Sequence, residues 1–219
     1  MATVLQIFIS PNAGAPMQGV QKVSAIKGLG LEGDRYARGG GTFSRIKETL
    51  VSSVRGPTPR HVSLIAHEAI TESNQTLTTP FTPAETRRNI VTEGVDLNDL
   101  VKKAFAIGEV HFWGFELCDP CNRPDRLSGK VGFKKAFDNC GGLRAAIVSD
   151  GIITVGDAVT MLTVHGLFAG QPLCGFRGGP PNAWPEGHRW VSLLEDHRYI
   201  TCRICRAMLP SYLSRLELA

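Results

Sequence analysis

Short runs of apolar and β-branched residues, separated by glycine and proline, dominate the pattern along the chain. Such runs, about four to eight residues long, are typical of β-strands rather than of long amphipathic helices. They predict strands at residues 3–9, 20–26, 61–65, 105–117 (one or two strands) and 159–164. Because these strands do not alternate regularly with long helices, a doubly wound parallel sheet is not favoured. The pattern predicts a mainly β (α+β) fold, a closed or partly closed β-barrel with peripheral helices.

Helical segments are expected to be few and short. Residues 66–74 and 123–138 predict two helices that follow strands. A third helix is predicted to start at Thr82, Pro83 and Glu85. Thr is a good N-cap, Pro fits the first helical position and Glu fits the third. That helix must be brief, because a β-branched run follows it directly.

The dipeptide Asp150-Gly151 lies between two apolar runs, at residues 145–149 and 152–155. Asp-Gly between such runs is the strongest short-range signal for a β-hairpin, because the two residues tolerate the positive φ angles of the turn. The two runs are therefore predicted to pair as neighbouring antiparallel strands.

Composition and charge narrow the class of protein. The chain has 219 residues, 42% of them hydrophobic and 20% charged, which is globular composition. A net charge of +4 without a clustered basic face argues against nucleic-acid binding, and no apolar window reaches the ~18 residues of a membrane helix. The first basic residue is Lys22, so a secretory signal is not expected, and the six cysteines are interpreted as thiols or ligands before disulfides. The expected location is therefore the cytoplasm.

The character of the chain changes near residue 165, where a stretch rich in glycine and proline begins. We therefore predict a β-barrel domain at residues 1–164 and a C-terminal extension at residues 165–219. Residues 188–206 of the extension contain two histidines and a Cys-x-x-Cys pair: His188, His197, Cys202 and Cys205. This set could bind zinc, although the histidines precede the cysteines, the reverse of a zinc finger. The alternative is a loosely packed extension that docks on the barrel.

A second cysteine pair, Cys118 and Cys121, follows a predicted strand and precedes the helix predicted at residues 123–138. A thiol at a helix N-terminus, next to Arg123 and Arg126, favours its thiolate form. Four interpretations remain open: a single reactive or metal-ligating thiolate, a redox dithiol, a zinc pair completed by distant cysteines, and two buried structural thiols.

Two further segments carry clustered donors for an anion. Residues 87–89 (Arg-Arg-Asn) lie where the short helix meets a strand, and their guanidinium forks and amide can bind a phosphate or carboxylate. Residues 32–35 (Glu-Gly-Asp-Arg) precede a glycine triplet whose backbone can approach an anion. The charge there would come from Arg35, Arg38, Arg45 and Lys47. Taken alone, the first segment is also compatible with a solvated pair of surface arginines. The second is equally compatible with a mobile surface loop.

Four segments together resemble the motifs of the MOSC domain family, the module found at the C-terminus of molybdenum-cofactor sulfurases. Residues 30–36 (Gly-Leu-Glu-Gly-Asp-Arg-Tyr) are similar to its opening motif, and residues 87–97 (Arg-Arg-Asn-Ile-Val-Thr-Glu-Gly-Val-Asp-Leu) to its central motif. Residues 108–121, which end in the cysteine pair, and residues 141–145 with 151–159 are similar to the last two. The four occur in the family's order across nearly the whole first domain. The chain thus resembles a stand-alone, bacterial-type MOSC protein.

The resemblance implies a MOSC-type β-barrel and a site for the molybdenum cofactor, a molybdenum–pterin. The family's site cysteine falls on Cys121. In related amidoxime-reducing enzymes that cysteine ligates molybdenum, and in the sulfurases it is thought to carry sulfur. The matching motifs also assign cofactor-binding residues: Arg35 and Arg87, which would hold the pterin phosphate, with Asn89, Arg144 and Asp157.

The expected function is a molybdenum-dependent oxidoreductase of the MOSC family that reduces N-hydroxylated compounds. Cys121 would be the protein's ligand to molybdenum, and a partner reductase would donate the electrons. The alternative is a carrier of sulfur (persulfide) or cofactor, without substrate turnover and with a cysteine desulfurase as partner. A catalytically silent barrel is a third interpretation. Because the chain has no aminotransferase-like region, pyridoxal phosphate is not expected on it.

Overall fold

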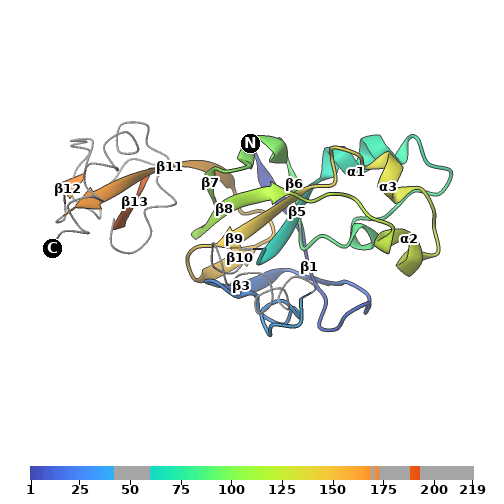
Figure 1. The fold of residues 1–219 in the computed structure, drawn as a ribbon, viewed down its shortest axis with the longest axis horizontal. Helices are drawn as coiled ribbons and strands as arrows, with labels where there is room; N and C mark the ends of the chain where they lie inside the picture. The colour runs from blue at the N-terminus through green and yellow to red at the C-terminus, as the bar shows by residue number, and fades with distance from the viewer. Residues whose placement is uncertain (42–59, 169–170, 173–187, 193–219) are drawn as a thin grey trace, which may run out of the picture. The chain divides into compact units, whose positions relative to one another are not determined.

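The computed structural model describes residues 1–41, 60–168, 171–172 and 188–192 (Figure 1). The chain divides into two compact units, Met1–Val159 and Thr160–Ala219. Strand β11 (Val159–Phe168) begins at the end of the first unit and continues into the second, where it pairs with β12 (Gln171–Pro172) and β13 (His188–Ser192). The boundary predicted near residue 165 falls within this strand and stays a prediction. The zinc candidates other than His188 lie outside the described residues.

The first unit is built around one long, curled and mostly antiparallel sheet. Strands β7, β8, β9, β5, β6, β1 and β2 follow β11 in this order across the sheet. Their bounds are β1 (Thr3–Ile9), β2 (Gln18–Val20), β5 (Val62–Ala66), β6 (Ile90–Glu93), β7 (Ala104–Ile107), β8 (Val110–Leu117) and β9 (Leu143–Ile147).

The residues just before β11 connect distant strands of this sheet, because they bond to β1 on one side and to the turn after β7 on the other. Ala158 bridges to Thr3 of β1, and the Asp157 carbonyl accepts a 2.9 Å hydrogen bond from Val4 N. The Ala158 carbonyl accepts a 3.1 Å hydrogen bond from Gly108 N, in the turn between β7 and β8. The sheet therefore curls back on itself. The predicted mainly β, barrel-like fold with few helices is confirmed.

A second, smaller sheet contains β10 (Gly151–Thr154), β3 (Lys22–Ile26) and β4 (Gly30–Leu31), in that order. The single strand predicted at residues 20–26 is wrong, because Gln21 separates β3 from β2. The two strands belong to different sheets, since β2 pairs with β1 and β3 pairs with β10. The break at Gln21 is thus where the chain passes from one sheet to the other.

The hairpin predicted at Asp150-Gly151 is also wrong. β9 pairs with β5 and β8, whereas β10 pairs with β3, where Gly151 lies opposite Ala25. The Asp150 carboxylate accepts a 2.7 Å hydrogen bond from Lys27 N, and a Cβ at Gly151 would come within 2.9 Å of the Val110 side chain. The dipeptide therefore connects β9 of one sheet to β10 of the other and does not form a hairpin turn. Glycine is needed because the Val110 side chain lies close to its Cα.

The helices at the periphery are short. Their bounds are α1 (His67–Asn74), α2 (Arg123–Ser128) and α3 (Phe133–Ala136), with the 3-10 turns η2 (Ala84–Thr86) and η3 (Leu97–Leu100). Within the described ranges, no helix has the length and apolar character needed to cross a membrane.

One continuous helix at residues 123–138, as predicted from the sequence, does not form. The chain breaks between α2 and α3, where Gly129 and Gly132 have φ angles of 75° and 103°. The Asp125 carboxylate accepts 3.0 Å hydrogen bonds from the backbone N–H groups of Gly132 and Phe133. These bonds and the left-handed glycines end α2 and start α3 in a new direction.

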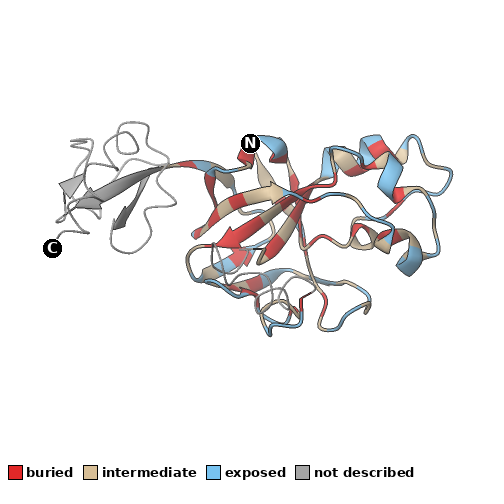
Figure 2. Cartoon of the chain, viewed as in Figure 1, coloured by how far each residue is buried: buried red, intermediate tan, exposed pale blue. Residues whose placement is uncertain are grey.

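Strands β5 and β6 are buried on both faces, because they run parallel and α1 connects them (Figure 2). On one face, Leu64 and Ile90 belong to the core enclosed by the sheets. On the other, Ile65 and Val91 pack with residues of the helical layer. The aromatic members of that second cluster are Phe81, Phe133 and Phe137. The helical layer is thereby fixed to the strands that position the site described below.

The helix start predicted at Thr82 is confirmed. The Glu85 carboxylate accepts hydrogen bonds of 2.7 Å from Thr82 N and 2.9 Å from Thr82 Oγ1. Glu85 N donates back to Thr82 Oγ1 over 3.4 Å, so the capping box is reciprocal. Lys130 Nζ lies 2.6 Å from the same carboxylate and ties the η2 turn to the loop after α2.

Replacing Glu85 with glutamine should lower the free energy of unfolding by about 1 kcal/mol at neutral pH. Burial raises the pKa of Glu85, but hydrogen bonds from Lys130 and Thr82 outweigh burial, so the pKa lies below its ordinary value of 4.5. A depressed carboxyl pKa stabilises the fold above the unfolded-state pKa, and this contribution is lost as the pH falls through the folded-state value. Denaturant titrations of both proteins should therefore show the difference shrinking below pH 4.5. A difference that stays constant on acidification would contradict this account.

Candidate functional site

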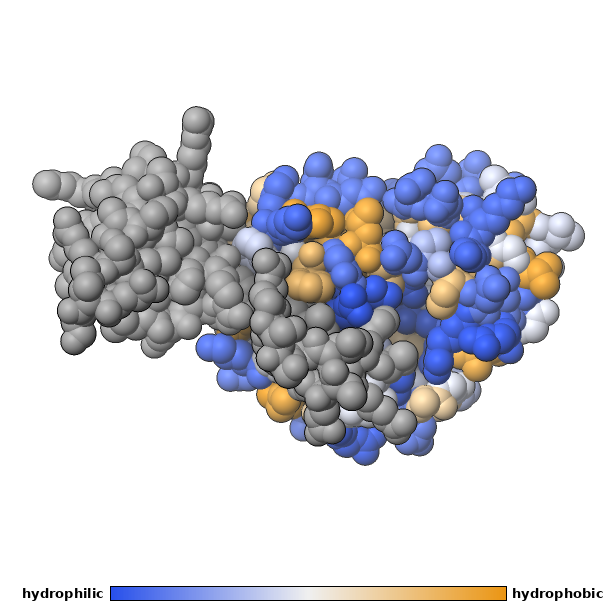
Figure 3. Space-filling view, viewed as in Figure 1, coloured by the Kyte–Doolittle hydropathy of each residue, from blue (hydrophilic) through white to orange (hydrophobic). Residues whose placement is uncertain are grey.

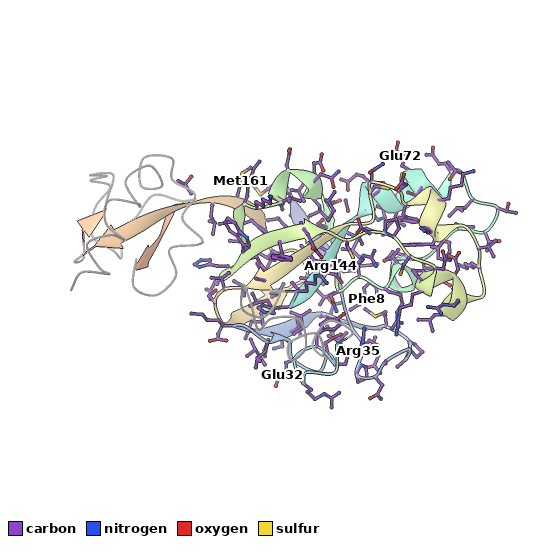
Figure 4. The ribbon with its side chains drawn as sticks, viewed as in Figure 1. Phe8, Glu32, Arg35, Glu72, Arg144 and Met161 are labelled. Carbon is purple, nitrogen blue, oxygen red and sulfur yellow. The ribbon has the colours of Figure 1, made fainter. Side chains whose placement is uncertain are left out.

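A cavity of about 300 Å³ lies in the first unit. Its lining comes from the end of β1 and the loop after it, the turn after β4, the start of β5, the link between η2 and β6, the loop after β8, α2 and β9. The lining residues are Ser10, Met17, 34–36, 60–63, 87–89, Cys118, Asp119, Cys121, Arg123, Pro124, Arg126 and Arg144. Figure 4 shows two of them in the first unit, Arg144 near its centre and Arg35 below it. On the face drawn in Figure 3, hydrophilic residues are spread across the coloured surface, with apolar residues between them.

Seven arginines make the cavity strongly cationic. They are Arg35, Arg60, Arg87, Arg88, Arg123, Arg126 and Arg144. Among the described residues, Asp34 and Asp119 are the carboxylates that line it. Guanidinium groups present forked donors that match phosphate and carboxylate oxygens. The cavity is therefore suited to an anion.

Arg87 occupies an unusual backbone position at the wall of this cavity. Its φ of 65° places it in the left-handed region, at the end of η2. Its guanidinium donates to the Ala15 carbonyl at 2.7 Å and to Ser10 Oγ at 3.2 Å. Burial lowers the pKa of Arg87, and the charges of Arg123 and Arg35 lower it further. Like charges therefore crowd at this wall, and a bound anion would relieve their repulsion.

The side chain of Asn89 connects three segments of the site. Its amide oxygen accepts a 2.9 Å hydrogen bond from Ser63 Oγ, and its amide nitrogen donates to the Phe8 carbonyl at 3.2 Å and to Asp34 Oδ2 at 3.3 Å. Asn89 lines the cavity, but the protein itself uses the polar atoms of its amide. These hydrogen bonds hold the walls of the cavity together.

Asp34 is the buried centre of the same wall, and the sequence reasoning did not assign it a role. It is 3% exposed, and its carboxylate accepts hydrogen bonds from Ser10 N at 2.8 Å and from Tyr36 N at 2.9 Å. The Arg35 guanidinium lies over the Tyr36 ring, 4.8 Å from its centroid. The acidic residue inside the 30–36 motif is the signal that could have identified it.

Arg144 is held by a carboxylate from the neighbouring strand. Its Nη1 lies 2.6 Å from Glu116 Oε1, and Arg60 Nε lies 2.7 Å from the same oxygen. Burial lowers the pKa of Arg144, but nearby Cys118 and the Glu116 carboxylate reverse the effect and raise it. A bulge in β8 sets this arrangement, because the pairing with β9 slips by one residue between Gly114 and Glu116. The slip places Glu116 directly opposite Arg144.

Both cysteines of the pair line the cavity, but they differ in exposure. Cys118 is 5% exposed, and its backbone N–H donates to the Gly142 carbonyl at 2.7 Å. Cys121 is exposed, and both thiols are free. In the described part of the chain, no three His, Cys, Asp or Glu side chains form a group that could hold a metal ion. A metal bound here would therefore depend on ligands from a cofactor in addition to the exposed thiol.

The MOSC domain model matches residues 51–160, half of the chain. This chain belongs to the MOSC domain family. No curated protein is similar enough to match it. The solved structure of the YuaD protein from Bacillus subtilis is 16% identical with a TM-score of 0.59, covering 74% of this chain and 96% of that one. YiiM from Geobacillus stearothermophilus is 14% identical (TM-score 0.55, 74% and 75% covered). YiiM from Escherichia coli is also 14% identical (TM-score 0.53, 74% and 70% covered). At these identities the likeness shows the fold alone.

In this MOSC chain, Arg88 fixes the loop that carries the cysteines. It is 6% exposed and donates to the carbonyls of Gly141 at 2.8 Å, Thr86 at 3.0 Å and Cys118 at 3.4 Å. The sequence reasoning gave Arg88 no role separate from that of Arg87. The left-handed backbone at Arg87 sets the directions of the Arg87 and Arg88 side chains. The sequence does not predict this conformation, because it is uncommon for an arginine.

Asp157 of the MOSC motifs does not line the cavity. Its carboxylate accepts a 2.8 Å hydrogen bond from Thr154 N, in the turn between β10 and β11. Arg38 also lies apart and donates to the Pro11 carbonyl at 2.9 Å, while Arg45 and Lys47 fall outside the described residues. Of the predicted site residues, the cavity brings together Arg35, Arg87, Asn89, Cys121 and Arg144.

Proposed function

We propose that this MOSC protein binds a molybdenum–pterin cofactor in the arginine-lined cavity and reduces N-hydroxylated compounds. One observation carries the proposal: a single cavity contains the exposed thiol of Cys121 and the crowded guanidinium groups of Arg35 and Arg87. A soft sulfur ligand suits the molybdenum of such a cofactor, and an anion-binding wall suits its phosphate.

The residues present fit this cofactor. Its phosphate matches the wall around Arg87, where burial and then the like charges of Arg123 and Arg35 lower the arginine's pKa. Its metal is bound by sulfur atoms of the pterin, so one protein thiolate is enough and a cluster of three protein ligands is not needed. Cys121 is the exposed thiol of the cavity and would supply that thiolate.

The chemistry balances as a two-electron reduction. An N-hydroxyl group takes up two electrons and two protons, its N–O bond breaks, and the amine and one water molecule leave. When bound, the molybdenum centre would supply the site that accepts the oxygen atom. Arg35 and Arg87 would hold the cofactor, and Arg88 keeps the thiol loop in place through its hydrogen bonds to the Gly141 and Cys118 carbonyls. The electrons come from a partner reductase.

Metal analysis of freshly purified protein tests the proposal. Stoichiometric molybdenum, together with turnover of an N-hydroxylated probe by a chemical reductant, is the expected result. A labile persulfide on Cys121 without metal would instead support the carrier function, because the exposed thiol could hold and release sulfur without a metal. Protein with neither molybdenum nor persulfide would overturn both.

The Arg87→Ala variant should retain the cofactor about tenfold to a hundredfold less tightly, as expected for the loss of a charge-assisted hydrogen bond worth about 1.5–3 kcal/mol. Arg87→Lys should also lose affinity, because a point charge does not replace a planar fork. Molybdenum and pterin content after gel filtration measure the loss. Arg38→Ala is the matched control, since Arg38 is exposed and does not line the cavity. Wild-type retention in both Arg87 variants would contradict the assignment.

A further inference from the structure

Ser10, directly after β1, connects three segments of the anion-binding wall. It is 2% exposed and lines the cavity. Its backbone N–H donates to Asp34 Oδ2 at 2.8 Å, and its carbonyl accepts a 3.0 Å hydrogen bond from Arg35 N. Its hydroxyl oxygen accepts a 3.2 Å hydrogen bond from Arg87 Nη2. One buried residue therefore fixes the backbone that carries Arg35 and the guanidinium of Arg87 relative to each other.

The Ser10 hydroxyl also holds the loop that follows it. Oγ lies 3.0 Å from the Asn12 carbonyl oxygen and 3.2 Å from the Ala15 carbonyl oxygen, and its single proton can be donated to either. The Ala15 carbonyl in turn accepts the 2.7 Å hydrogen bond from Arg87 Nη1. Among the described residues, both acceptors of the Arg87 side chain therefore depend on Ser10, one directly and one through this loop.

Arg87 needs such an anchor, because neighbouring cations repel it. Burial lowers the pKa of Arg87, and the charges of Arg123 and Arg35 lower it further. Without a fixed acceptor, this repulsion favours rotamers that turn the guanidinium away from Arg35. The two bonds engage two of the five N–H groups of the guanidinium, so three remain for a ligand.

We infer that Ser10 is a positioning residue for anion binding: its hydroxyl holds the Arg87 guanidinium where Arg87 and Arg35 can bind one phosphate group together. The inference rests on the proposed function only for the identity of that anion, the phosphate of the cofactor. Donors that are held in place before the ligand arrives bind it more tightly, because less conformational entropy is lost on binding. Removing the hydroxyl should therefore weaken anion binding, and it should do so through Arg87.

Calorimetric titration of the full chain with inorganic phosphate tests the inference, because it needs neither molybdenum nor turnover. Ser10→Ala removes the hydroxyl and keeps the backbone bonds to Asp34 and Arg35. This variant should bind phosphate about threefold to tenfold more weakly than the wild type, as expected for the loss of one hydrogen bond. Ser24→Ala is the matched control, since the Ser24 hydroxyl bonds to Glu32 outside the cavity, and it should keep the wild-type affinity.

A double-mutant cycle with Arg87→Ala separates positioning from a general loss of cavity structure. If the hydroxyl acts through Arg87, Ser10→Ala should have no further effect on phosphate affinity in the Arg87→Ala background. The other arginines of the cavity supply the residual binding that makes this comparison measurable. Equal losses in both backgrounds, or wild-type affinity in Ser10→Ala, would overturn the inference.

Nitrogen-15 NMR of the arginine side chains gives a second readout that needs no ligand. Two acceptors restrict rotation of the wild-type Arg87 guanidinium, so its Nη groups should give separate signals, which Arg87→Ala assigns by their loss. In Ser10→Ala these signals should merge as the guanidinium rotates faster, and in Ser24→Ala they should stay separate. Signals that stay separate in Ser10→Ala would contradict the positioning role.

The phosphate titration also distinguishes this inference from the proposed function. Phosphate binding that depends on Ser10 through Arg87 supports the inference even in protein that never acquires molybdenum, and that lack of metal overturns the proposed function alone. Wild-type protein that binds no phosphate overturns the inference, whatever its metal content.

Discussion

The Cys121→Ser variant should lose its bound molybdenum, its N-reductive activity and any persulfide. Cys121 is the exposed thiol of the cavity. A serine hydroxyl is a hard and largely protonated donor, so it does not replace a thiolate at a metal–sulfur bond. Metal analysis and turnover of an N-hydroxylated probe measure the first two losses separately, and release of sulfide by a reductant measures the third.

Cys118→Ser is the matched comparison, because Cys118 lines the same cavity but is only 5% exposed. This variant should keep most of the metal and most of the activity. A dithiol mechanism makes a different prediction, since it needs both sulfurs and either substitution would disable it. Equal loss in the two variants would contradict the single-thiolate assignment. Full activity of Cys121→Ser would remove this residue from the site.

Gly142→Ala should lower the free energy of unfolding by about 4 kcal/mol, as the sum of backbone strain and overpacking. The φ of Gly142 is 102°, in the region that side chains rarely adopt. An added Cβ would also overlap the backbone carbonyl of Leu64 in β5. Any shift that relieves the overlap moves the Gly142 carbonyl, which accepts the hydrogen bond from Cys118 N. Chemical denaturation monitored by circular dichroism measures the loss.

Gly129→Ala separates the two contributions. Its φ of 75° is also positive, but no atom lies within 4 Å of the added Cβ. This variant should therefore lose only about 1 kcal/mol, the strain of a left-handed alanine. Equal losses at both positions would mean that the backbone conformation alone requires glycine at position 142, without a contribution from the approach to β5.

Local signals in the sequence predicted the elements that depend on local contacts. The capping box at Thr82 and Glu85 formed as expected, because both partners lie within one turn. The runs at residues 3–9 and 61–65 became β1 and β5 within one residue at each end. The Asp150-Gly151 signal failed because β10 pairs with β3, and that pairing depends on a strand more than a hundred residues away.

The site residues likewise include some that the sequence predicted and some whose roles depend on tertiary contacts. The family motifs pointed to Cys121, Arg35 and Arg87, and the structure places all three in one cavity. The same motifs could not show that Asp157 closes a distant turn or that the amide of Asn89 is occupied by protein groups. A motif records which residues occur together in the chain, whereas the hydrogen bonds of each side chain depend on the tertiary fold.

The junction at Ala158 also determines the order in which the barrel can be completed. Thr3 and Ala158 lie at opposite ends of the first unit's sequence, yet they are bridged in the sheet. During synthesis from the N-terminus, β1 therefore cannot pair with the segment at Ala158 until nearly the whole unit has been made. Closing so long a loop is entropically unfavourable and slow, so this pairing belongs to the late stage of folding. Until then the Thr3 end of one edge of β1, beyond its pairing with β2, stays open to other strands, and this makes the nascent chain prone to aggregation in that interval.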